Sequence, residues 1–93
     1  MNRGEVMYQM FIQQYIQKLT KDDIQRFAKE QNIILSESEI NLFYENVKQN
    51  WKVILYGDPT PLFEQMKSKL QSSTYEKMLE LYDFFKKKYQ NFL

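Results

Sequence analysis

The sequence predicts an all-α fold, a compact bundle of about five short helices that forms one domain over residues 1–93. The chain contains only two glycines and two prolines, and it is rich in the helix-forming residues Gln, Lys, Glu and Leu. Apolar residues recur every three or four positions along most of its length, which is the period of one helix face. With 43% hydrophobic residues, a chain of this length can bury a core without disulfides or a structural metal.

The first helix is expected over residues 5–18. Its apolar residues fill one arc of roughly 140° at 100° per residue, which is wide enough to form a core face. These residues are Tyr8, Phe11, Ile12, Tyr15, Ile16 and Leu19. Met7 and Met10 fall on the other side of the helix, among glutamines. They belong either to a mobile terminal turn or to a methionine-rich contact surface for a partner or a second copy.

Residues 19–50 are the predicted centre of the fold, arranged as a helix, an extended connector and a second helix. Thr20 is a suitable N-cap, because its hydroxyl can accept the backbone amide hydrogen of Asp23. The helix is expected over about residues 21–31 and should stop at Asn32, which tolerates the left-handed cap conformation. Its expected buried face consists of Ile24, Phe27 and Ala28.

The connector over residues 33–35 consists of three large apolar residues, Ile-Ile-Leu, which we expect to be extended and pressed into the core. The spacing of Ser36 and Glu39 predicts a capping box, in which each side chain accepts the backbone amide hydrogen of the other residue. The following helix is then expected to bury Ile40, Phe43, Tyr44 and Val47.

From residue 19 the chain contains, in this order and with other residues between them, Leu-Thr, two acidic residues, Ile, Phe-Ala, Asn-Ile, Ser and Glu-Ile. A second pair of amphipathic helices is expected after them. Over about residues 18–89 this pattern resembles a small all-helical family of uncharacterised proteins from low-GC Gram-positive bacteria, a domain of unknown function. The resemblance implies an all-helical intracellular protein, and it implies no activity, cofactor or functional residues. The chain departs from the family in the linker WKVILYGDPTP, which is bulkier and richer in proline.

The end of the helix that follows Ser36 has two interpretations. Apolar spacing allows the helix to continue to Tyr56, where Gly57-Asp58-Pro59 would be its stop signal. Alternatively, the helix ends near Asn50 and residues 51–56 form a buried extended connector, which the family resemblance favours.

Two more helices are expected. Asp58 or Thr60 would cap the first, with Pro59 or Pro61 at its first position; its buried side is Leu62, Phe63, Met66 and Leu70. The last helix is expected over residues 74–91, with a capping box of Ser73 and Glu76. An apolar stripe runs along its whole length and is typical of a bundle core: Tyr75, Met78, Tyr82, Phe85, Tyr89 and Phe92, widened by Leu79 and Leu81. Phe84 points away from this stripe.

The composition excludes most catalytic chemistry. The chain has no His and no Cys, which removes imidazole acid–base catalysis, thiol nucleophiles and the usual zinc sites. Gly4 and Gly57 are its only glycines, too few for a phosphate-binding loop or a dinucleotide fingerprint. The acidic pairs Asp22/Asp23 and Glu37/Glu39 lie in first turns of helices, where capping explains them. We therefore expect no enzyme activity, no cofactor and no metal site.

Nucleic-acid binding is the alternative function. The helix–connector–helix differs from a DNA-binding helix-turn-helix, because glutamates at the start of its second helix would be repelled by phosphates. The densest basic patch is Lys86-Lys87-Lys88, which also suits the negative end of the helix dipole. A weak, nonspecific contact with phosphates would use five lysines, Lys67, Lys69, Lys86, Lys87 and Lys88.

The sequence favours a non-enzymatic protein–protein interaction module over a nucleic-acid binder. Four apolar residues lie off the predicted core faces and form a candidate surface for a protein partner or a second copy: Met7, Met10, Leu42 and Phe84. The absence of cysteine fits a reducing compartment, and no apolar run approaches the length of a membrane span or of a signal-peptide core. We expect a cytoplasmic bacterial protein.

Overall fold

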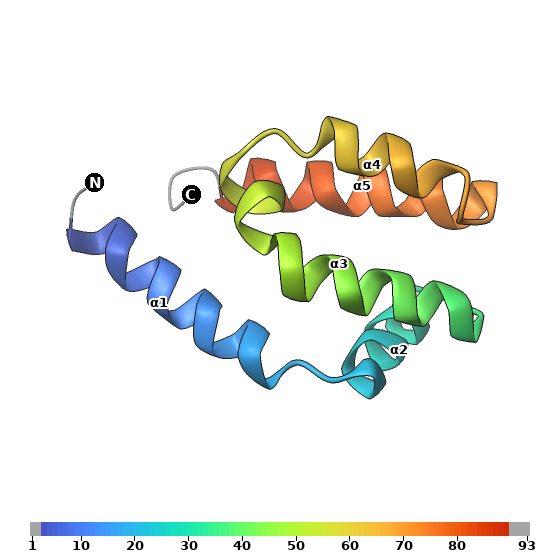
Figure 1. The fold of residues 1–93 in the computed structure, drawn as a ribbon, viewed down its shortest axis with the longest axis horizontal. Helices are drawn as coiled ribbons and strands as arrows, with labels where there is room; N and C mark the ends of the chain where they lie inside the picture. The colour runs from blue at the N-terminus through green and yellow to red at the C-terminus, as the bar shows by residue number, and fades with distance from the viewer. Residues whose placement is uncertain (1–2, 90–93) are drawn as a thin grey trace.

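The computed structural model describes residues 3–89. The described part of the chain contains five helices and no strand, which confirms the all-α prediction (Figure 1). The helices are α1 (Arg3–Lys18), α2 (Lys21–Glu30), α3 (Glu37–Tyr56), α4 (Thr60–Lys67) and α5 (Ser72–Tyr89). None of these helices has both the length and the apolar composition that crossing a bilayer requires.

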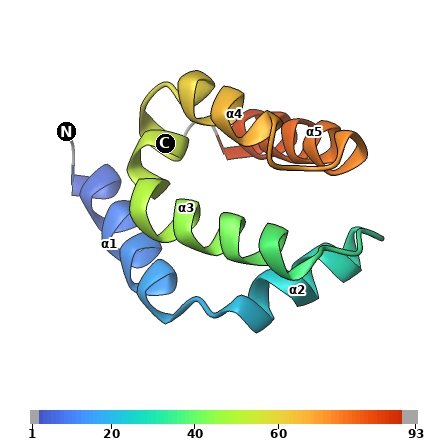
Figure 2. The same ribbon diagram turned by 45° about the vertical axis from the view of Figure 1, so that its right-hand side comes forward.

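The central helix of the fold is α3 (Figure 2). Helices α1 and α2 pack against it on one side, and α4 and α5 form an antiparallel hairpin on the other (Figures 1 and 2). The most buried cluster lies between α3 and this hairpin and consists of Phe63, Met66 and Leu70, as expected for α4. Leu42, Phe43 and Ile54 of α3, Leu62 of α4, and Tyr75, Met78 and Tyr82 of α5 pack around it.

Both capping boxes of the central unit are present. The Thr20 hydroxyl accepts the Asp23 amide hydrogen at 3.2 Å, and Asp23 Oδ2 accepts the Thr20 amide hydrogen at 2.9 Å. The reciprocal distances between Ser36 and Glu39 are 3.2 and 3.1 Å. Asn32 follows α2 with a positive φ of 61°, the left-handed conformation that the sequence predicted for this position.

Helix α3 continues to Tyr56, which decides between the two interpretations of its end. Asn50 marks a kink rather than a terminus, because its backbone angles of −124° and 16° are not helical. The Gly57 amide donates to the Val53 carbonyl at 3.0 Å and closes the helix. The extended connector that the family resemblance favoured over residues 51–56 is therefore wrong.

The starts of α4 and α5 differ from the predictions. Pro59 is the N-cap of α4 and Pro61 is its second residue, so neither proline occupies the first position; Asp58 Oδ1 accepts the Thr60 amide hydrogen at 3.1 Å. Helix α5 begins at Ser72, because the Gln71 carbonyl already accepts the Tyr75 amide hydrogen. Ser73 therefore lies inside the first turn and is not an N-cap. The expected helix end at Asn91 lies outside the described residues.

The predicted core face of α1 is only partly correct. Ile12, Ile16 and Leu19 are half-buried, whereas Phe11 and Tyr15 are 63% and 66% exposed and Tyr8 is 43% exposed. Because α1 packs mainly against α3, one neighbouring helix covers only part of the apolar arc. Two hydrogen bonds hold the end of α1 in this orientation, from Lys48 Nζ to the carbonyls of Ile16 and Gln17 at 2.6 and 2.8 Å.

Three other side chains differ from the predicted burial. Ile34 is 88% exposed, because successive side chains of an extended segment point to opposite sides and only its neighbours turn inward. Phe27 of α2 is 53% exposed. Leu42, which was expected off the core, packs against the central cluster.

The molecule exposes more surface than a compact monomer of its size. Its accessible surface is 6901 Å², whereas a folded monomer of 11.4 kDa is expected to expose about 5,800 Å². Among the described residues, large hydrophobic side chains on α1, α2 and α5 are exposed. Apolar surface is therefore available for contacts beyond the chain's own core.

Candidate binding groove

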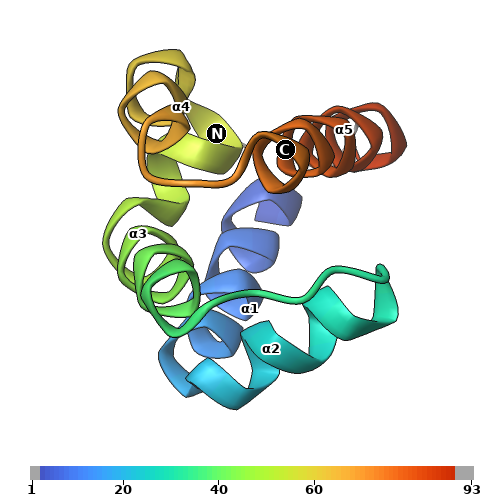
Figure 3. The ribbon, with the colours of Figure 1, turned by 90° about the vertical axis from the view of Figure 1, so that its right-hand side faces the viewer.

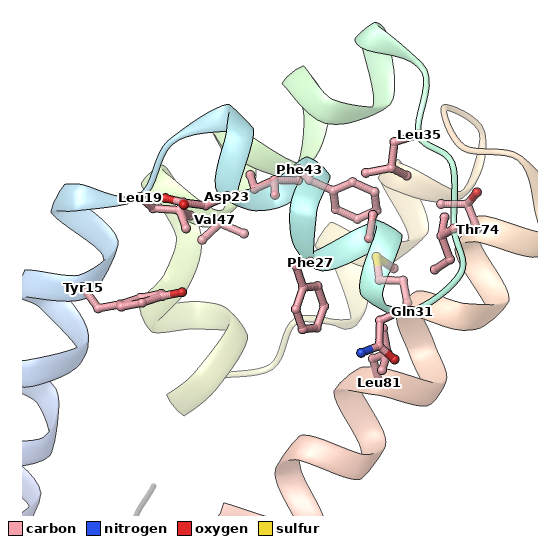
Figure 4. Close-up of a pocket in the computed structure, with 14 residues that line it drawn as sticks. Tyr15, Leu19, Asp23, Phe27, Gln31, Leu35, Phe43, Val47, Thr74 and Leu81 are labelled. Atoms are coloured by element: carbon pink, nitrogen blue, oxygen red, sulfur yellow. The ribbon is translucent and has the colours of Figure 1, made fainter.

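An apolar groove of about 290 Å³ opens between α2, α3 and α5, with the end of α1 at one side (Figures 3 and 4). Figure 3 shows how α2, α3 and α5, the helices that carry most of its lining, are arranged relative to one another. Fourteen residues line it: Tyr15, Leu19, Asp23, Ile24, Phe27, Ala28, Gln31, Ile33, Leu35, Phe43, Val47, Thr74, Met78 and Leu81. We refer to these residues as the apolar groove.

The helix-capping interactions determine which side chains reach the groove. The capping box at Thr20 sets the start of α2, so that Ile24, Phe27 and Ala28 fall on one face of that helix. Successive side chains of the extended connector point to opposite sides. Ile33 and Leu35 therefore point toward the same space, as Figure 4 shows for Leu35. The sequence assigned all five of these side chains to a core, whereas the structure leaves an open groove among them.

Helix α5 supplies the opposite wall. Thr74, Met78 and Leu81 lie at a spacing of four and three residues, and therefore on one helix face. The position of this wall depends on Glu39, which is only 3% exposed. Besides completing the capping box of α3, its Oε2 atom accepts the Gln71 amide hydrogen at 3.1 Å, directly before α5.

The polar groups of the groove are few. Thr74 is buried, and Gln31 and the Tyr15 ring lie at its edge (Figure 4). Asp23 is the one acidic residue of the lining. Hydrogen bonds from the backbone and hydroxyl of Thr20, with the nearby Arg26, lower the pKa of Asp23 below its usual 3.8. Its carboxylate is therefore ionised at neutral pH and accepts hydrogen bonds from Thr20 and Arg26.

This lining is suited to binding apolar groups. A single ionised carboxylate with its own hydrogen-bond donors is a poor proton donor at neutral pH. Within residues 3–89, no group of three or more acidic side chains lies close enough together to hold a metal ion. What the groove offers a ligand is apolar surface, including the exposed ring of Phe27.

The four apolar residues expected to form one surface do not lie in one environment. Met7 and Met10 of α1 are 51% and 56% exposed, and Phe84 of α5 is 64% exposed, so these three are accessible to a partner. Leu42 is packed against the central cluster and is not available. None of the four lines the groove. Sequence reasoning missed the groove because the apolar periodicity of its walls is the same as that of a closed core.

The five lysines also fall into separate places. Lys67 and Lys69 lie at one end of the α4–α5 hairpin and Lys86–Lys88 near the other (Figure 1). The two groups of lysines are separated by most of the length of α5, about 25 Å at 1.5 Å per residue. Lys86 Nζ donates to the Leu55 carbonyl at 3.2 Å and so caps the end of α3. Lys87 pairs with Asp83 at 2.9 Å, and the ammonium groups of Lys67 and Lys88 lie 5.9 and 5.8 Å from the rings of Tyr75 and Phe84. The lysines do not form one continuous patch.

Comparison with known proteins brings no further assignment: no protein-family model, no curated protein and no solved structure matches the chain. The resemblance to a bacterial domain of unknown function stays a prediction.

Proposed function

We propose that the protein is a non-enzymatic protein–protein interaction module whose apolar groove binds the apolar face of an amphipathic helix from a partner protein. The observation that carries the proposal is the open groove lined by α2, α3 and α5. Grooves between helices bind partner helices through apolar side chains spaced three and four residues apart. The exposed ring of Phe27 gives such a helix a contact that is available before binding.

Two features support a protein partner over a phosphate-bearing one. The lining has no lysine or arginine, whereas nucleic-acid affinity comes mainly from cations that neutralise phosphates. The lysines proposed for the alternative function are spread over both ends of the α4–α5 hairpin, and Lys86 is engaged with the Leu55 carbonyl. The alternative of weak nonspecific nucleic-acid binding therefore has less support. A cytoplasmic location in a bacterium also belongs to the proposal: the absence of cysteine fits a reducing compartment, and the bacterial origin comes from the family resemblance alone.

The test uses two leucines of α5. Leu81 lines the groove and Leu79, two residues earlier, does not and is 37% exposed. Peptides that bind the purified protein would be selected from a library of amphipathic helices, and their dissociation constants measured by fluorescence anisotropy. We expect Leu81→Glu to weaken binding at least about tenfold, because a carboxylate would be placed in an apolar contact. Leu79→Glu should leave the dissociation constant unchanged.

Circular dichroism and urea unfolding of both variants would establish that they remain folded. A library that yields no binder, or binders whose affinity responds equally to the two substitutions, would contradict the proposed function. Binding that decreases steeply with salt and is lost when Lys86, Lys87 and Lys88 are replaced by Gln would favour nucleic-acid binding instead.

A further inference from the structure

Helix α1 carries an exposed apolar surface without charge. From Met7 to Gln17 the sequence contains no Asp, Glu, Lys or Arg, although 27% of the chain is charged. Within this stretch Met7, Met10, Phe11 and Tyr15 are 51%, 56%, 63% and 66% exposed. We refer to these four residues as the α1 surface. Depletion of charge together with enrichment in Met, Phe and Tyr is typical of the core of a protein–protein interface.

The α1 surface has the position and size that an interface requires. Helix α1 packs mainly against α3, and its outer side lies at the edge of the molecule (Figure 1). Its four side chains expose roughly 400 Å², given 150–250 Å² for a whole aromatic residue. Exposed glutamines lie beside them, namely Gln13, Gln14 and Gln17. They increase the contact area that the face can bury, and a standard interface buries about 800 Å² on each partner.

We propose that the α1 surface pairs with the same surface of a second copy of this chain, with the two α1 helices antiparallel. Residues near the two-fold axis of such a dimer face their own counterparts, so a charge there would meet a like charge. The uncharged stretch from Met7 to Gln17 avoids this repulsion.

The antiparallel orientation follows from the charge at the end of α1. In a parallel pair the two Lys18 ammonium groups would lie side by side, whereas an antiparallel pair separates them by the length of the helices. Opposed helix dipoles also attract each other. The two-fold axis then passes near Phe11, which lies midway between Met7 and Tyr15, the two ends of the α1 surface.

This inference goes beyond the proposed function, because the groove and the α1 surface share only Tyr15. The test compares two phenylalanines of nearly equal exposure, Phe11 on α1 at 63% and Phe84 on α5 at 64%. Analytical ultracentrifugation over a concentration series would measure the mass of the wild-type protein, Phe11→Glu and Phe84→Glu. We expect a dimer of twice 11.4 kDa for the wild type and Phe84→Glu, and at least about tenfold weaker association for Phe11→Glu.

Single cysteines would test the orientation, since the chain has none of its own. Under oxidising conditions Met10→Cys, one residue from the proposed axis, should form a disulfide-linked dimer. Met7→Cys should not form one. Residue 7 lies four residues from Phe11 on each helix, so the two cysteines would be separated by eight residues, about 12 Å along the helix axis at 1.5 Å per residue. Cross-linking of both variants would overturn the antiparallel arrangement.

A wild-type chain that stays monomeric at every concentration, or a dimer that Phe84→Glu weakens and Phe11→Glu does not, would overturn the dimer proposal. Retention of peptide binding by a monomeric protein would then leave the groove function standing. Loss of peptide binding in Leu81→Glu with an unchanged dimer mass would likewise separate the two sites.

Discussion

The carboxylate of Glu39 accepts the backbone amide hydrogen of Gln71 at 3.1 Å, across 32 positions of the chain. The same carboxylate caps α3 through the Ser36 amide hydrogen at 3.1 Å. One buried side chain thus connects the start of α3 to the residue that precedes α5. Because α5 forms one wall of the groove, this connection positions the wall relative to α2 and α3.

Replacement of Glu39 is expected to destabilise the fold. Glu39→Ala leaves the Ser36 and Gln71 amide groups without this acceptor, which should lower the free energy of unfolding by about 2–3 kcal/mol. Glu39→Gln keeps one acceptor oxygen and should lose about half as much. Urea unfolding measures both values. Glu37→Ala, at an exposed position of the same turn, is the control, and an equal loss there would contradict the role assigned to Glu39.

Lys48 is expected to hold α1 on α3. Its ammonium group donates to two of the last carbonyls of α1, those of Ile16 and Gln17. These carbonyls lie too close to the helix end for a regular helical hydrogen bond, although the Ile16 carbonyl also accepts the Leu19 amide hydrogen at 3.2 Å. Lys48→Met keeps most of the side-chain volume and removes both hydrogen bonds, so the free energy of unfolding should decrease by about 1–2 kcal/mol. Hydrogen exchange should accelerate in α1 more than in α4. Lys69→Met, at an exposed position, should change neither quantity.

The left-handed backbone of Asn32 predicts different effects on stability for two substitutions. Asn32→Gly is expected to leave stability unchanged or slightly increased, because glycine adopts a φ of 61° without steric strain. Asn32→Val should destabilise the protein by about 1–2 kcal/mol, since a β-branched residue is strained there. Thermal unfolding of the two variants provides the comparison. Equal melting temperatures would contradict the assigned conformation.

The lowered pKa of Asp23 predicts a loss of stability in acid. The hydrogen bonds from Thr20 favour the ionised carboxylate in the folded state, so their contribution to stability is present above 3.8, the usual pKa that the carboxyl regains in the unfolded chain. It disappears as the pH decreases through the lower folded value. Urea midpoints measured from pH 6 to pH 2 should therefore decrease less in Asp23→Asn than in the wild type. Thr20→Val keeps the backbone donor to the carboxylate and removes the hydroxyl, which also accepts the Asp23 amide hydrogen. It should therefore be less stable at every pH and have an intermediate pH dependence.

A second carboxylate should also contribute to the loss of stability in acid. The hydrogen bonds from Thr60 lower the pKa of Asp58, so Asp23→Asn should reduce the pH dependence without abolishing it. Identical profiles for the wild type and Asp23→Asn would contradict the assignment.

Local sequence determined the helices and several of their ends. The capping boxes at Thr20 and Ser36 and the left-handed Asn32 require only residues within a few positions of one another. The central packing of Phe63, Met66 and Leu70 was also predictable, because Phe63 and Met66 lie on one face of α4 and Leu70 continues their spacing just beyond the end of that helix. For α5 the same reasoning chose the wrong cap, since Ser73 matched the pattern of a cap but the chain became helical at Ser72.

Only the tertiary structure decided which apolar faces are covered. The periodicity of Phe11 and Tyr15 on α1, and of Phe27 on α2, is that of a core face, yet all three are more than half exposed. Periodicity reports which side chains share a face, whereas burial depends on how many neighbouring helices reach that face. Helix α1 meets mainly α3, and α5 stands across an open groove from α2. The sequence therefore determined the helices and their apolar faces, and their arrangement around α3 decided which of these faces form the core and which stay available to a partner.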